Sequence, residues 1–103
     1  MEQIRLQDAA AALGLPCTED TEIMSITTDT RKIEAGSLFV ALVGERFDGH
    51  DFVEAALDNG AVAAVVSRPV ENVPQEKLLM VADTRRALME LAGLTSFSAL
   101  FSR

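Results

Sequence analysis

Apolar positions near the start of the chain follow the period of an amphipathic helix. The positions that share one helical face, at i, i+3, i+4 and i+7, are all apolar: Leu6, Ala9, Ala10 and Leu13. Gly14 and Pro16 follow directly, and both residue types are typical of a helix end. A helix is therefore predicted over residues 6–13.

Four short apolar runs predict strands. Residues 22–27 form the first, with Ile23 and Ile26 as its core residues, although their spacing does not follow strict alternation. Residues 38–43 and 61–66 are continuous apolar runs, as expected of strands that are buried on both faces. Residues 78–82 form the fourth. A turn at residues 32–36 separates the first two strands, and Gly36 can supply a backbone angle that other residues resist.

Two further helices are predicted between and after these strands. The first covers residues 51–59, with Phe52, Ala55 and Ala56 as its core stripe and Gly60 as its C-terminal cap. The second begins after Asp83, a typical N-cap residue. Its apolar face is formed by four residues: Ala87, Leu88, Leu91 and Ala92.

The order of these elements predicts an α/β fold. A strand, a helix and a strand at residues 38–66 form a βαβ unit, which should be parallel with a right-handed crossover. We expect a small single domain, with a mixed sheet of about four strands containing this unit and with flanking helices. The 103 residues suit one domain.

Composition narrows the classes of function. The formal net charge of −7 disfavours nonspecific binding to nucleic acid or to an anionic membrane, because the overall field repels both. Cys17 is the only cysteine, which excludes an internal disulfide and favours a reducing compartment. The sequence shows neither a signal peptide nor an apolar stretch near the ~20 residues of a membrane span. We expect a soluble, cytoplasmic protein.

Motifs for phosphate cradles and zinc are missing from the sequence. It contains neither G-x-x-x-x-G-K-[ST] nor G-x-G-x-x-G, and one His with one Cys makes a Cys/His zinc site implausible. Asp48 and His50 could act as an acid–base pair. The alternative is that Asp48 and Gly49 form a turn and that His50 lies at a helix start.

The polar segment before residues 38–43 offers a second candidate site. Arg31 and Lys32 could bind a phosphate or pyrophosphate, since the guanidinium is a planar fork of donors. The alternative is that Arg31 pairs with Asp29 or another acidic residue and only fixes the turn. Thr27, Thr28 and Thr30 add hydroxyls, which suit a ligand but are also routine in strands and turns.

One long motif resembles a known family. The segment T-T-D-T-R-K-I-E-A-G-S-L-F-V-A-L-V-G-E-R-F-D-G-H-D-F-V, followed by G-A-V-A-A-V-V-S-R, resembles the N-terminal domain of the Mur ligases. The D-[ST]-R turn is shared by several of these ligases. The part L-F-V-A-L-x-G-E-R-F-D-G-H-D-F is more similar to the members that add D-alanyl-D-alanine to UDP-N-acetylmuramoyl-tripeptide. The resemblance covers about residues 6–93.

The resemblance implies a role in peptidoglycan synthesis. The full-length ligases are three-domain, cytoplasmic enzymes that use ATP and Mg²⁺ and proceed through an acyl phosphate. Their N-terminal domain holds the UDP end of the UDP-N-acetylmuramoyl-peptide substrate, while ATP binds the central domain. By position, the implied substrate-binding residues are Thr28, Asp29, Thr30, Arg31, Glu45, Arg46, Phe47, Asp48, Gly49 and His50. The resemblance implies neither catalytic residues nor metal ligands in this chain, and no cofactor of its own.

The last residues depart from the family pattern. The relatives continue into a glycine-rich ATP loop, whereas here L-T-S-F-S-A-L-F-S-R follows. We therefore expect a UDP-binding domain at residues 1–93 and a truncated or atypical tail at residues 94–103. The domain is not expected to catalyse alone, because the central and C-terminal ligase domains are missing. An apolar stripe at residues 94–101 predicts possible self-association.

Two other functions remain as alternatives. One is a stand-alone interaction or regulatory module that kept the fold without the ligand. The other is a small independent enzyme that uses Asp48 and His50.

Overall fold

A four-stranded parallel sheet forms the centre of the protein. The computed structural model describes residues 4–15, 21–46 and 48–92. The strands of the sheet lie side by side in chain order: β3 (Ser25–Thr27), β4 (Ser37–Val40), β5 (Ala63–Val66) and β6 (Leu78–Met80). A separate antiparallel pair is formed by β1 (Ile4–Arg5) and β2 (Glu22–Ile23).

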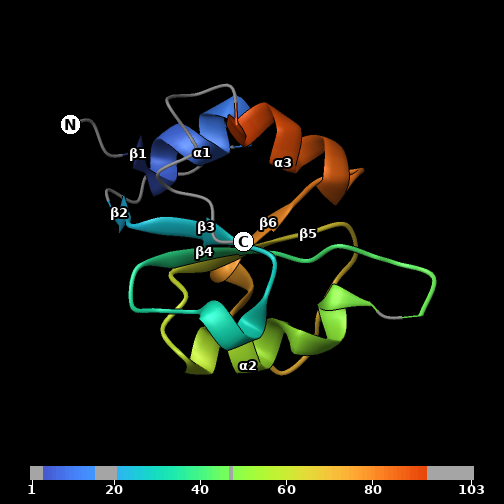
Figure 1. Ribbon diagram of the computed structural model, residues 1–103. Coiled ribbons are helices and arrows are strands. Elements are labelled where there is room, and N and C mark those ends of the chain that lie inside the picture. The colour runs from blue at the N-terminus through green and yellow to red at the C-terminus, as the bar shows by residue number, and fades with distance from the viewer. Residues whose placement is uncertain (1–3, 16–20, 47, 93–103) are drawn as a thin grey trace.

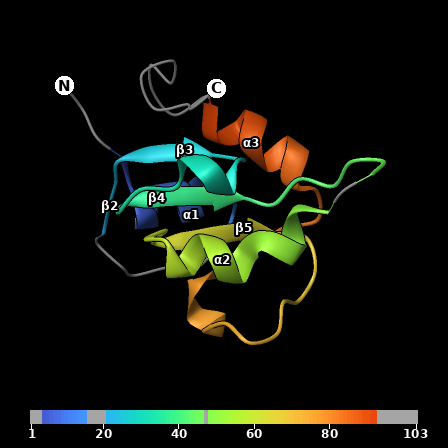
Figure 2. The ribbon, with the colours of Figure 1, turned by 60° about the horizontal axis from the view of Figure 1, so that its bottom comes forward.

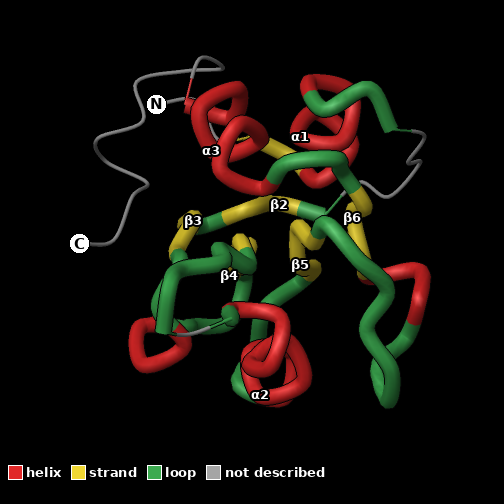
Figure 3. The backbone as a smooth tube through the Cα atoms, turned by 90° about the vertical axis from the view of Figure 1, so that its right-hand side faces the viewer, coloured by secondary structure: helices red, strands yellow, loops and turns green. Residues whose placement is uncertain are grey.

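Helices cover both faces of the sheet. Helices α1 (Leu6–Ala12) and α3 (Thr84–Ala92) lie together on one face, and α2 (Val53–Asp58) lies on the other (Figures 1 and 3). Figure 2 shows α2 in front of β5. The chain is thus a three-layer α/β domain, which confirms the predicted fold class and its flanking helices.

Strand β4 contributes side chains to two hydrophobic clusters, one on each face of the sheet. Leu38 and Val40 pack in the cluster of α1 and α3, whereas Phe39 packs in the cluster of α2. All three side chains are at most 1% exposed. Successive strand residues point to opposite faces, so a strand covered on both sides is apolar at every position. The prediction of a strand buried on both faces is confirmed, although its regular part ends at Val40 and Val43 is 50% exposed.

The predicted βαβ unit is present as β4–α2–β5. Strands β4 and β5 are parallel, with Phe39 opposite Ala64. One detail differs from the expected mixed sheet: all three strand pairings of the central sheet are parallel, and antiparallel pairing is confined to β1 and β2. The reason lies in the connections, which cross from the end of one strand to the start of the next and contain a helix or a 3-10 helix rather than a tight hairpin.

The single strand predicted for residues 22–27 is two strands. Met24 separates β2 from β3, and its backbone N–H donates to the carbonyl of Gly36 at 2.8 Å. Ile23 and Ile26 are both fully buried, as predicted. Because they belong to two different sheets, their spacing does not need to alternate.

The predicted core stripe of the second helix is confirmed only in part. A short 3-10 helix, η2 (Gly49–Phe52), precedes α2. Val53 and Ala56 are buried, whereas Phe52 is 45% exposed and Ala55 is also exposed. A 3-10 helix has three residues per turn, so the α-helical period cannot be extended back through it. The prediction is therefore confirmed for Ala56 and wrong for Phe52 and Ala55.

The two predicted glycine positions and the predicted cap at Asp83 are confirmed. Gly36, in the turn before β4, and Gly60, after α2, have positive φ angles of 93° and 116°. Asp83 caps α3 by accepting the backbone N–H of Arg85 at 2.9 Å. Ala87 and Leu91 are buried in the core below it.

The tail at residues 94–103 lies outside the described residues, as does its predicted self-association. In the part of the chain that the structure describes, every helix is too short to cross a membrane.

Candidate functional site

A surface cavity of about 560 Å³ opens beside the carboxyl ends of β3 and β4. Its lining comes from the turn after β3, from β4 and from η2: Thr28, Asp29, Thr30, Arg31, Phe39, Gly49 and Phe52. Ligands of open α/β sheets bind outside the carboxyl ends of the strands. The cavity therefore lies where this class of fold places its binding sites.

The turn after β3 is held by hydrogen bonds within five residues. The Thr27 hydroxyl accepts the backbone N–H of Asp29 at 3.1 Å, and Asp29 Oδ1 accepts the backbone N–H of Arg31 at 2.9 Å. The second bond caps a 3-10 helix, η1 (Thr30–Lys32). Small polar side chains form such turns because they replace backbone partners. The turn places residues 28–31 on one wall of the cavity.

Asp29 and Arg31 also pair through their side chains. Arg31 Nη2 donates to Asp29 Oδ2 at 2.9 Å, and Arg31 Nε donates to Asp29 Oδ1 at 3.1 Å. The Arg31 hydrogen bonds lower the pKa of Asp29, and the Asp29 hydrogen bond raises the pKa of Arg31. The Arg31 side chain is nevertheless 88% exposed. The pairing considered as an alternative is present, and the guanidinium still lies on the cavity wall.

The opposite wall comes from η2. The Gly49 backbone N–H donates to the Leu42 carbonyl at 2.7 Å. A Cβ on Gly49 would lie 2.8 Å from that carbonyl oxygen, so glycine allows this close approach. Phe52 presents a half-exposed ring to the same cavity, and buried Phe39 lines it from β4.

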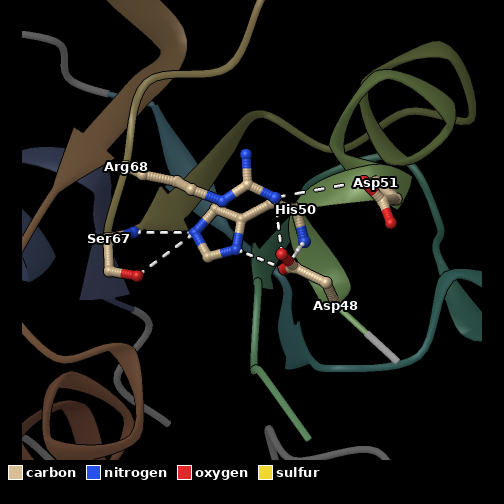
Figure 4. Close-up of polar contacts among 5 residues, drawn as sticks. All are labelled: Asp48, His50, Asp51, Ser67 and Arg68. Carbon is tan, nitrogen blue, oxygen red and sulfur yellow. Dashed lines mark hydrogen bonds and ion pairs between the residues drawn. The ribbon is translucent and has the colours of Figure 1, made fainter. Parts of the chain in front are cut away.

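Asp48 and His50 lie on either side of Gly49 and face the end of β5 (Figure 4). Asp48 Oδ1 accepts the His50 backbone N–H at 2.9 Å and contacts His50 Nδ1 at 2.6 Å. Asp48 Oδ2 forms an ion pair with Arg68. The Arg68 hydrogen bond and then the His50 backbone N–H hold the pKa of Asp48 well below its usual range.

The hydrogen bonds of the His50 ring define its tautomer. His50 Nε2 lies 2.9 Å from the backbone nitrogen of Ser67, which can only donate. Nε2 is therefore the acceptor, and Nδ1 carries the proton that it donates to Asp48. The His50 side chain is fully buried. A buried ring with both nitrogens in use favours the structural interpretation of Asp48 and His50 over an acid–base pair.

The structure brings only part of the predicted site together. Thr28, Asp29, Thr30, Arg31 and Gly49 line the cavity. Asp48 and His50 instead bind Ser67 and Arg68. Glu45 and Arg46 are exposed and do not line it, and Phe47 lies outside the described residues.

Sequence reasoning missed two cavity residues, Phe39 and Phe52. Phe39 is hidden within a continuous apolar run that gives no sign of which side chains reach a surface. Phe52 was assigned to the core stripe of the helix. Its position next to the polar Asp48–Asp51 segment was the one signal that it lies near a site.

Comparisons with known proteins agree with this architecture. Residues 22–95 match the family described as "Mur ligase family, catalytic domain". A UDP-N-acetylmuramoyl-tripeptide–D-alanyl-D-alanine ligase of Escherichia coli is 54% identical over 75 residues, which are 72% of this chain and 16% of that protein. The ligase of the same name from Bacillus subtilis is 47% identical over 81 residues, 78% of this chain and 18% of that protein.

Solved structures give the same result. A crystal structure of MurF from Acinetobacter baumannii matches with a TM-score of 0.71 and 40% identity, over 88% of this chain and 20% of that one. The chain thus spans about a fifth or less of the relatives that it matches. On sequence and fold together, the chain belongs to the Mur ligase family and is an N-terminal domain of that family.

Proposed function

We propose that this chain binds the UDP end of a UDP-N-acetylmuramoyl-peptide for a ligase that adds D-alanyl-D-alanine to the tripeptide. The observation that carries the proposal is the cavity at the carboxyl ends of β3 and β4. All seven of its lining residues lie in the segment that resembles the family, and five of them are among the implied substrate-binding residues. The names of the relatives supply the substrate.

The lining offers chemistry that suits a nucleoside diphosphate. Thr28 and Thr30 carry hydroxyls that can bond to a base edge or a ribose. Phe52 offers an apolar ring face, on which a base or sugar can pack. Arg31 can turn its guanidinium from Asp29 to a phosphate at little cost, because an exposed ion pair contributes little.

The proposed role is substrate holding rather than catalysis. ATP and Mg²⁺ would act in the central and C-terminal domains of a full-length, cytoplasmic enzyme of peptidoglycan synthesis. Those domains and the UDP-muramoyl-peptide are the proposed partners. Within residues 4–15, 21–46 and 48–92, the structure contains no cluster of three or more His, Cys, Asp or Glu that could hold a metal ion.

Calorimetric titration tests the proposal. UDP and UDP-N-acetylmuramic acid should bind saturably at one site per chain, while ADP at the same concentrations should not bind. ADP is the matched control because it carries the same diphosphate on a different base. A folded chain that binds neither uridine nucleotide, or binds ADP equally well, would contradict uridine recognition and leave an interaction module as the better reading.

A further inference from the structure

We infer that Arg68 is a positioning residue for the cavity, acting through Asp48 to hold Gly49 in place. This inference deepens the proposed function and rests on it. Gly49 lines the cavity, yet its neighbours Asp48 and His50 do not. Their side chains reach instead to Ser67 and Arg68, directly after β5. We call Asp48, His50, Ser67 and Arg68 the β5 latch (Figure 4).

The β5 latch restrains the two residues that flank Gly49. Asp48 is bound on both carboxylate oxygens, by His50 on one side and by Arg68 on the other. His50 is bound on both ring nitrogens, by Asp48 and by the Ser67 backbone N–H. A second contact joins Arg68 to Asp51 at 3.9 Å. Residues 48–50 are therefore attached to the end of a central strand.

This attachment matters for the shape of the cavity. One wall follows β3, whereas the Gly49 wall follows a loop that leaves the sheet after β4. The Gly49 N–H donates to the Leu42 carbonyl, but this hydrogen bond joins two residues of the same loop and does not connect the loop to another strand. The β5 latch instead links residues 48–50 to a different strand, β5. A wall that is held before binding lowers the entropy lost on binding.

Arg68 is the member that can be changed without disturbing the core. Its side chain is 50% exposed, whereas the His50 ring is fully buried. Arg68→Ala is the test variant, and Arg68→Lys keeps a cation that can still pair with Asp48. Arg86→Ala is the matched control, because it removes the same charge from an exposed position on α3 that lines a different cavity.

Two measurements on the intact chain test the inference. Hydrogen exchange of the Gly49 and Ser67 amides reports the loop, and the Met24 amide, bonded to Gly36, serves as a remote reference. Titration with UDP reports the cavity. In Arg68→Ala we expect faster exchange at Gly49 and Ser67, unchanged exchange at Met24 and UDP binding weakened about threefold to fivefold. An exposed ion pair contributes at most about 1 kcal/mol, which corresponds to about a fivefold change in affinity. Arg68→Lys should recover most of both losses, and Arg86→Ala should match the parent.

Other outcomes overturn the inference in distinct ways. Weaker UDP binding with unchanged Gly49 exchange would mean that Arg68 touches the ligand itself. Unchanged exchange together with unchanged binding would mean that the β5 latch positions nothing. Equal losses in Arg86→Ala would assign the effect to net charge. If the parent chain binds no UDP at all, the proposed function fails, and the exchange of Gly49 alone decides whether Arg68 holds the loop.

Discussion

Arg31 combines two features that usually occur apart, a paired guanidinium and a largely exposed side chain. Its side chain donates three hydrogen bonds to Asp29. Its 88% exposure leaves the group in a high-dielectric environment, where ion pairs are weak. Asp29 has a further task, since it also accepts the Arg31 backbone N–H and caps η1. The two residues therefore contribute unequally to the turn.

Single substitutions should separate these contributions. Asp29→Ala should lower the melting temperature, because the cap of η1 is lost with the pair. Arg31→Ala should leave the melting temperature nearly unchanged but weaken UDP binding about ten- to a hundredfold if a charge-assisted bond to phosphate is lost. Melting curves and UDP titrations on both variants measure this. Equal melting losses with unchanged affinity would show that Arg31 serves only the turn.

Asp48 gives the chain a specific response to acid. Its pKa is lowered in the folded chain, first by Arg68, so the unfolded chain binds this proton more tightly. The stability that Asp48 contributes is therefore present above its unfolded pKa of about 3.9 and is lost as the pH falls below it.

The substitution Asp48→Asn should remove that response. Urea unfolding at pH 7 should show Asp48→Asn less stable than the parent, and the difference should shrink as the pH is lowered to 3. Glu54→Gln, on the exposed side of α2, is the charge-matched control. A parent–variant difference that stays constant between pH 7 and pH 3 would contradict the assignment of the lowered pKa to Asp48.

At the scale of elements, the start of α2 joins the core to the cavity. η2 turns Phe52 toward the cavity and Val53 into the core. These two adjacent residues therefore have different roles, one in the cavity and the other in the core. The 3-10 helix η2 takes Phe52 out of the core stripe predicted for α2. Among the described residues that line the cavity, Phe52 is therefore the only half-exposed aromatic residue.

Two alanine substitutions should show this division. Val53→Ala should destabilise the fold by about 1–3 kcal/mol, because it opens a cavity in a fully buried site. Phe52→Ala should cost less stability but weaken UDP binding, since an apolar face of the cavity is lost. Chemical denaturation and titration of each variant provide the measurements. A larger loss of stability in Phe52→Ala than in Val53→Ala would show that Phe52 contributes to the core.

The elements that could be predicted from sequence are those whose signal is local. The apolar run through Leu38, the caps at Gly60 and Asp83, and the period of α1 each depend on neighbours in the chain. The break at Met24 could not be predicted, because it depends on a bond to Gly36, twelve residues away. For the candidate site, the turn at residues 28–31 was recognisable by its residue types. The direction of Asp48 and His50 was not, because the predicted βαβ unit places two strands side by side but does not show which side chains after them bond to each other.

At the scale of the whole molecule, the cavity uses only the part of the fold between β3 and α2. Phosphoryl transfer needs a phosphate cradle and held Mg²⁺, and the sequence carries no cradle motif. The purified chain should therefore bind UDP without turning over ATP. An assay of phosphate release with ATP and Mg²⁺ should equal a matched blank. Turnover above that blank by homogeneous protein would contradict a holding role.

The order of the sheet strands has a consequence for how the protein folds. Each strand of the sheet β3-β4-β5-β6 pairs with the next one along the chain. Because each strand of this sheet pairs with its neighbour in sequence, only the connections between consecutive strands must close. These connections are short, so the entropic cost of closing them is small. Refolding after dilution from denaturant should then be fast for a parallel sheet and fit one exponential. The contact between His50 and Ser67 spans only seventeen residues, so it can close as soon as β4, α2 and β5 have assembled. The binding surface would then be complete before β6 and α3 have folded.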